Sequence, residues 1–295
     1  MKQVNIVSPC CLHLGFARAN GQLCELGIAL QHPQIQLVAR PSSQLSVSGP
    51  RADVMLDAVE HLAHKHHLPL QGTIEIELAI PAHMGLGSDG MLRASAKHIM
   101  TIWHNIRTSF RVSLPEHAFT QGGVLLVNDE GLVQQRATIA HADDANEWVF
   151  VMIWPKEPDA IANDFEAQRL NELRRAAVNL SKLDTTDLFD AVARNDFVAF
   201  ADSLEAIHLA NEAALAASGY PITLSEQDND ILDFVRANGA VVSWRAITGL
   251  ALIGLIKGAD PSRALRKALT EKLGYFGPLV MASICDNAGA RVITS

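Results

Sequence analysis

The sequence contains few aromatic residues and no long apolar run. Phe, Trp and Tyr make up only 5% of the chain, so the core must be built mainly from Leu, Ile, Val and Ala. No window approaches the roughly 18 uninterrupted apolar residues that a membrane-spanning helix needs. The opening segment MKQVNIVSPCC also lacks the long apolar core of a signal peptide. These absences predict a protein that has no membrane partner.

Cysteine is scarce as well. The chain has four, Cys10, Cys11, Cys24 and Cys285, of which two are adjacent and none forms a Cys-x-x-Cys pair. Such a pattern is typical of reduced thiols, because disulfide frameworks use evenly spaced cysteines in oxidising compartments. The cysteines therefore predict a cytoplasmic protein.

An excess of basic residues is also missing. Lys and Arg number 24 against 32 Asp and Glu, which gives a net charge of −8, and no Lys/Arg run stands out. Because binding to nucleic acid depends on clustered basic side chains, no nucleic-acid partner is predicted. A phosphorylated small molecule would need a local positive site, since a global positive field is absent.

The predicted elements divide the chain in two. The first half is rich in short apolar strands such as 4–7, 73–80 and 148–154, with helices at 52–66 and 91–103. Residues 160–218 are mostly helical, and the final part predicts a helix that starts at Asp260-Pro261 and a strand pair at 279–285 and 290–294. This order predicts an α+β fold with two domains, residues 1–155 and 156–295.

The most informative stretch is the loop Pro81-Ala-His-Met-Gly-Leu-Gly-Ser-Asp-Gly, which ends at Gly90 and lies between a predicted strand and a predicted helix. Glycines there let the backbone turn tightly and approach a ligand, and the amino end of the following helix favours an anion such as phosphate. The alternative is that the glycines only make a tight turn. Their spacing matches neither a Walker A loop nor a Rossmann fingerprint.

Asp89 raises a physical objection to phosphate binding. Its carboxylate stands where a phosphate would lie, and two negative groups repel each other. Either a metal ion lies between them, or the Asp89 side chain turns outward. In the first case Ser88 and Asp89 are the predicted metal ligands, because hydroxyl and carboxylate oxygens suit magnesium.

The glycine loop resembles the P-x-x-x-G-L-G-S motif of GHMP kinases. Further segments narrow the resemblance to the β-ribofuranosylaminobenzene 5′-phosphate synthase branch of that superfamily and follow its order along nearly the whole chain. They are Ser8-Pro9 with Leu12-His13-Leu14-Gly15, Gly27-Ile28-Ala29-Leu30, Arg111 with Phe119 and Gly122-Gly123, and Ser243-Trp244.

This resemblance implies a GHMP-type fold, with an N-terminal ribosomal-S5-like α/β domain and a C-terminal ferredoxin-like α+β domain. It also implies a reaction, in which phosphoribosyl pyrophosphate condenses with an aryl acid of the 4-aminobenzoate type. Carbon dioxide and pyrophosphate leave, as in methanopterin-type cofactor biosynthesis. Mg²⁺ and the glycine loop would hold the pyrophosphate.

The resemblance also assigns roles to individual residues. His13 and Arg111 are the candidate catalytic residues. The candidate phosphate- and substrate-binding residues are His83, Gly85, Leu86, Gly87, Ser88, Asp89, Gly90, Ser243 and Trp244, and the candidate metal ligands are Ser88 and Asp89.

The chain departs from this branch where bulkier residues replace glycine or another small residue, at Asp89, Ser113, Pro115 and Arg245. Two other hypotheses therefore stay open. One is an ATP-dependent GHMP small-molecule kinase that also uses Mg²⁺. The other is a non-catalytic homologue that partners an active paralogue. The expected assembly is a homodimer or a hetero-oligomer with such a paralogue.

Overall fold

The computed structural model describes residues 2–106, 112–141, 143–155, 164–178, 180, 183–274 and 277–295. The strands are β1 (Val4–Ala19), β2 (Gln22–Arg40), β3 (Leu45–Ser48), β4 (Gly72–Leu78), β5 (Val124–Asn128), β6 (Val133–Ala137), β7 (Trp148–Trp154), β8 (Val242–Arg245), β9 (Leu252–Lys257), β10 (Leu279–Ser283) and β11 (Arg291–Thr294). The helices are α1 (Ala52–His66), α2 (Ser88–His104), α3 (Leu114–Gln121), α4 (Phe165–Ala177), α5 (Thr186–Ala193), α6 (Phe197–Ala217), α7 (Glu226–Ala237) and α8 (Ala259–Leu273).

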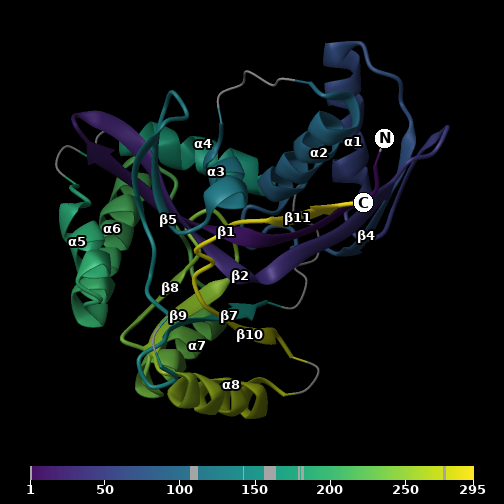
Figure 1. Ribbon diagram of the computed structural model, residues 1–295. Coiled ribbons are helices and arrows are strands. Elements are labelled where there is room, and N and C mark those ends of the chain that lie inside the picture. The colour runs from purple at the N-terminus through teal and green to yellow at the C-terminus, as the bar shows by residue number, and fades with distance from the viewer. Residues whose placement is uncertain are drawn as a thin grey trace.

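The first sheet is organised around the long antiparallel strands β1 and β2 (Figure 1). Its order is β11-β1-β2-β4-β3, and β5 pairs with the end of β2 opposite to β4 and carries β6. The prediction that the first strand ends before Pro9 was wrong, because β1 continues to Ala19. The register shifts between Ser8 and Cys10, so the strand passes the proline, which has no N–H to donate, in an irregularity of the ladder.

The second sheet has the order β10-β7-β9-β8 and is antiparallel throughout. The predicted strand β7 is confirmed, and all seven of its residues are buried. The predicted pairing of the last two strands was wrong: β10 pairs with β7, and β11 pairs with β1. The turn between them carries the chain from the second sheet back to the first. The division into 1–155 and 156–295 stays a prediction.

Helices cover both sheets and complete the mixed α+β fold that the sequence predicts. The predicted helix at 52–66 is confirmed as α1, which packs on α2 (Figure 1). Its buried face includes Met55, Val59 and Leu62. The predicted start of the helix at Asp260-Pro261 was wrong by one residue, because α8 begins at Ala259, after Gly258. Among the described residues, no helix is long and apolar enough to span a membrane.

Candidate functional site

The glycine loop joins β4 to α2 through left-handed backbone. His83 has φ +64°, Gly85 φ +77° and Gly87 φ +68°, and Gly87 is the residue that precedes the first turn of α2. This region is strained for residues with a side chain, so two of the three positions need glycine. The loop turns tightly, as the sequence predicts.

The close approach that Gly85 permits is to the chain itself. A Cβ added to Gly85 would lie 2.8 Å from the Cβ of Ala246 and 3.0 Å from the amide nitrogen of Gly249, in the loop between β8 and β9. The two loops are also joined by a hydrogen bond from the Leu250 N–H to the His83 carbonyl at 2.8 Å. The glycine loop is therefore held from the side of the second sheet.

The other loop glycines also pack against protein. A Cβ on Gly87 would lie 3.1 Å from the carbonyl oxygen of Cys11 in β1, and one on Gly90 would lie 2.7 Å from Pro115 in α3. In addition, the Cys11 N–H donates to the Leu86 carbonyl at 3.0 Å. Pro115, which replaces a smaller residue of the synthase branch, thus packs against the first turn of α2.

Arg51 lies at the amino end of α2 and contacts both predicted metal ligands. Its Nη1 donates to Ser88 Oγ at 2.5 Å and its Nη2 to Asp89 Oδ1 at 2.5 Å. Ser88 is fully buried, whereas the Asp89 side chain is 48% exposed. The Asp89 carboxylate is therefore neutralised by a guanidinium.

A bare metal ion does not fit Ser88 and Asp89, because the Arg51 cation already contacts both side chains. Nor do the described residues contain any group of three or more His, Cys, Asp and Glu side chains that suits a metal ion. The guanidinium, the Ser88 hydroxyl and the amino end of α2 instead suit a phosphate.

Glu166, in the first turn of α4, also contacts the glycine loop. Its Oε1 accepts a hydrogen bond from the Gly85 N–H at 2.8 Å. The residue is half-buried, but its carboxylate end is enclosed, and this burial raises the pKa of Glu166 to about 7. The hydrogen bond from Gly85 and the charge of Arg51 oppose that rise, while Asp89 adds to it. A carboxylate thus lies where the loop offers an amide to an anion.

His13 is brought next to the glycine loop by β1. Its N–H donates to the Gly85 carbonyl at 3.4 Å, and its Nδ1 accepts from the Gly15 N–H at 3.2 Å. Its buried Nε2 has no hydrogen-bond partner among the described residues and lies 3.9 Å from Glu25. Burial lowers the pKa of His13 to about 4, against the opposing charge of Glu25 and with that of Arg174. His13 is therefore a neutral imidazole at pH 7. The other predicted catalytic residue, Arg111, lies outside the described residues.

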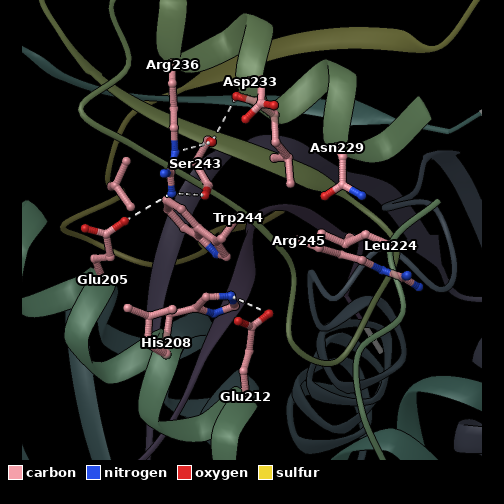
Figure 2. Close-up of a pocket in the computed structure, with 13 residues that line it drawn as sticks. Glu205, His208, Glu212, Leu224, Asn229, Asp233, Arg236, Ser243, Trp244 and Arg245 are labelled. Carbon is pink, nitrogen blue, oxygen red and sulfur yellow. Dashed lines mark hydrogen bonds and ion pairs between the residues drawn. The ribbon is translucent and has the colours of Figure 1, made fainter. Parts of the chain in front are cut away.

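Ser243 and Trp244 lie on β8 and face a different pocket of about 220 Å³ between α6, α7 and β8 (Figure 2). The Ser243 hydroxyl is engaged within the protein, since it donates to the Leu232 carbonyl and accepts from Arg236 Nε. The Trp244 ring packs 6.2 Å from that of His208. Of the described residues in the glycine loop, none lines this pocket.

A salt bridge and a histidine–carboxylate contact line the walls of the pocket in Figure 2. Arg236 pairs with Glu205 at 3.0 Å, and His208 Nε2 lies 3.1 Å from Glu212 Oε1. The strand that carries Ser243 and Trp244 leads directly into the loop that contacts Gly85. The structure therefore brings His13 and residues 83–90 together and places the Ser243 and Trp244 side chains elsewhere.

Sequence reasoning missed Arg51 and Glu166, two charged residues that contact the loop. Arg51 follows Gly49-Pro50 and has left-handed backbone at φ +59°, just before α1. Only the turn-forming Gly-Pro pair hinted that this residue was unusual. Glu166 is one acidic residue in a charged helix, and nothing in the local sequence distinguishes it from Glu172.

No protein-family model matches the chain, and no curated protein does. Solved structures with this fold are found at low sequence identity. A galactokinase from Lactococcus lactis complexed with galactose is 13% identical, with a TM-score of 0.67, over 98% of this chain and 95% of that one. A homoserine kinase from Cytophaga hutchinsonii is 16% identical, with a TM-score of 0.62, over 99% and 97%.

A third similar structure is the protein abbreviated MDDEF in complex with MVAPP, AMPPCP and magnesium. It is 14% identical, with a TM-score of 0.67, over 100% of this chain and 99% of that chain. The structural neighbours belong to the GHMP superfamily. At such low identity the likeness shows the fold alone, and the predicted GHMP-type fold is confirmed over the whole chain.

Proposed function

We propose that the chain is an ATP-dependent small-molecule kinase of the GHMP type, which binds the phosphates of the nucleotide with its glycine loop and Arg51. The contact between Glu166 and Gly85 is the observation that carries this proposal. A carboxylate oxygen 2.8 Å from the Gly85 nitrogen means that this amide is oriented to hold an oxyanion. The kinase fold of the neighbours supports a phosphate as the ligand.

Phosphoryl transfer needs charge neutralisation and positioning more than covalent chemistry from the protein. The Arg51 guanidinium, which also pairs with Asp89, supplies N–H donors beside Ser88, and the amino end of α2 adds a partial positive charge. Magnesium, when bound with the nucleotide, would neutralise phosphate charge further. Within the chain, the contacts of Gly85 with the 246–249 loop fix the direction of the amide.

Two other functions use the same residues. In the synthase hypothesis, the anion is the pyrophosphate of phosphoribosyl pyrophosphate, and His13 beside Gly85 would face the substrate. The non-catalytic hypothesis has its own supporting observation, because Pro115 covers Gly90 and Glu166 takes the Gly85 amide. All three make different predictions about which ligand stabilises the protein.

Thermal unfolding with Mg-AMPPCP, or with Mg-phosphoribosyl pyrophosphate, separates them. A ligand that binds the folded state stabilises it by RT ln(1 + [L]/Kd), so Tm rises with ligand affinity and concentration. We expect Mg-AMPPCP to raise Tm and Arg51→Asn to abolish the rise; asparagine tolerates the left-handed backbone at this position. Arg40→Asn, which removes an exposed arginine from β2, is the matched control. A response to phosphoribosyl pyrophosphate alone would favour the synthase, and no response to either ligand would favour the non-catalytic homologue.

A further inference from the structure

Helix α4 is anchored at both ends against the candidate site. In its first turn, Glu166 binds the Gly85 amide, and the Phe165 ring meets the His83 ring edge-on at 6.2 Å. Near its last turn, Arg174 pairs with Glu25 beside His13. Glu166 and Arg174 are eight residues apart and therefore share a face of the helix.

The middle of this face is apolar. Leu170 and Leu173 pack in a cluster with Phe16 of β1, and the Arg174 guanidinium lies 5.7 Å from the Phe16 ring. Packing of this kind holds α4 on β1 independently of Glu166. The apolar contacts with β1 therefore position α4, and the position of α4 places the Glu166 carboxylate at the loop.

The surroundings of Glu166 contain charges of both signs. Arg51, which precedes α1, stabilises the ionised form, and Asp89 on α2 destabilises it. His83 in the loop lies in the field of the same two residues. Burial is the largest influence and acts against the charge. The contact with Gly85 therefore keeps a partly disfavoured anion in place.

We propose that Glu166 is an internal oxyanion that closes the glycine loop and leaves the Gly85 amide when a phosphate oxygen binds. This inference rests on the proposed function, because it assumes that the loop takes a phosphate. One N–H holds one strong acceptor well, and two anions at one amide repel each other. A phosphate can bind only when Glu166 leaves the Gly85 amide, and this requirement weakens phosphate binding. The contact between Glu166 and Gly85 is therefore autoinhibitory.

Sulfate is the probe for this proposal, because it stays doubly negative through the neutral range where phosphate and ATP titrate. Its dissociation constant is measured by calorimetry for the wild type, Glu166→Ala, Glu166→Gln and the control Glu172→Gln. Glu172 lies on the same helix but pairs with Arg169. We expect Glu166→Ala to bind sulfate at least about tenfold more tightly than the wild type at about pH 8, and Glu172→Gln to match the wild type.

The pH dependence gives a second readout. Wild-type affinity for sulfate should rise from about pH 8 to about pH 6 as Glu166 gains a proton, and Glu166→Ala should lose most of that rise. His83→Asn, at a left-handed position that asparagine tolerates, separates any contribution of His83. If His83→Asn abolishes the rise and Glu166→Ala keeps it, the proposal is overturned.

The outcomes also distinguish closure of the loop by Glu166 from the proposed kinase function. Equal sulfate affinity in the wild type and Glu166→Ala overturns the closure by Glu166 but leaves anion binding intact. No binding of sulfate or Mg-AMPPCP by any variant overturns the proposed function as well. Should Glu166→Ala fail to fold, Glu166→Gln carries the test, since it removes the charge and keeps the shape.

Discussion

Gly249 and Gly85 touch backbone to backbone: a Cβ added to Gly249 would lie 2.0 Å from the Gly85 nitrogen. This contact joins the loop after β8 to the loop before α2, and so couples the second sheet to the candidate phosphate site. Glycine at these positions serves contact within the chain. The same contact orients the amide that Glu166 accepts from.

Substitution of Gly85 should cost more than substitution of an equally left-handed glycine in open space. Gly85→Ala adds a Cβ 2.8 Å from Ala246 to the strain of φ +77°, whereas Gly219 has φ +85° and nothing within 4 Å. We expect Gly85→Ala to lose about 2–4 kcal/mol of unfolding free energy and Gly219→Ala about 1–2 kcal/mol. Urea denaturation measures both, and equal losses would mean that Ala246 and Gly249 leave room for a methyl group.

The sequence predicts the fold well where local pattern and tertiary contacts agree. Helix α1 and strand β7 have the predicted bounds, because each shows a clear apolar pattern between residues that end it. The sequence fails at β1, where Pro9 signals an end but long-range pairing with β2 continues the strand. It also fails to place β10 and β11, since a turn signal does not say which sheet the next strand joins.

Glu166→Gln should become more stable relative to the wild type as the pH rises. The folded-state pKa of about 7 lies above the ordinary value of 4.5, so the folded protein holds this proton more strongly than the unfolded chain. This contribution to stability is complete below about pH 4.5 and is lost as the pH rises to about 7. We expect the unfolding free energy of Glu166→Gln, relative to that of the wild type, to increase by up to about 3 kcal/mol across that range.

Urea denaturation at intervals of pH measures this difference, and Glu172→Gln again serves as the control. A difference that stays constant with pH would show that the Glu166 carboxylate is well solvated. The comparison of variants is needed because other groups titrate in the same range.

His13 should act in the opposite direction. Its folded-state pKa of about 4 lies below the ordinary value of 6.5, so the unfolded chain takes up the proton more readily. The neutral, buried ring therefore contributes stability above about pH 6.5 that is lost as the pH falls toward 4. His13→Asn keeps an acceptor for the Gly15 N–H and should remove up to about 3 kcal/mol of this acid sensitivity. The check is the slope of unfolding free energy against pH; an unchanged slope contradicts the prediction.

Asn211 should be among the costliest polar residues to replace. It is fully buried on α6, accepts from the Phe16 N–H at 2.9 Å, and donates to the carbonyls of Phe16 and Ile207. These bonds satisfy the backbone of β1 next to the irregularity at Gly15. We expect Asn211→Ala to cost about 2–4 kcal/mol, since it leaves buried backbone groups unpaired. Asn229→Ala, on the exposed face of α7, should lose below about 0.5 kcal/mol of unfolding free energy. Urea denaturation measures both variants, and equal losses would contradict the role given to Asn211.

The candidate site was only partly predictable from the sequence. The glycine loop is a local signal, because its residues are contiguous and left-handed positions demand glycine. Arg51, just before α1, lies 38 residues from its partner Asp89 along the chain, and Glu166 of α4 lies 81 residues from its partner Gly85. Tertiary packing that no local pattern encodes brings both side chains to the loop. The Asp89 objection could not be resolved from the sequence for the same reason, since its counter-charge is Arg51.

The most direct test of the account is the backbone amide resonance of Gly85, followed by NMR while Mg-AMPPCP is added to the wild-type protein. Exchange of the Glu166 carboxylate for a phosphate oxygen predicts a saturable shift of the Gly85 signal, and Arg51→Asn should abolish it. A Gly85 signal that stays fixed at saturating nucleotide would contradict phosphate binding at this loop.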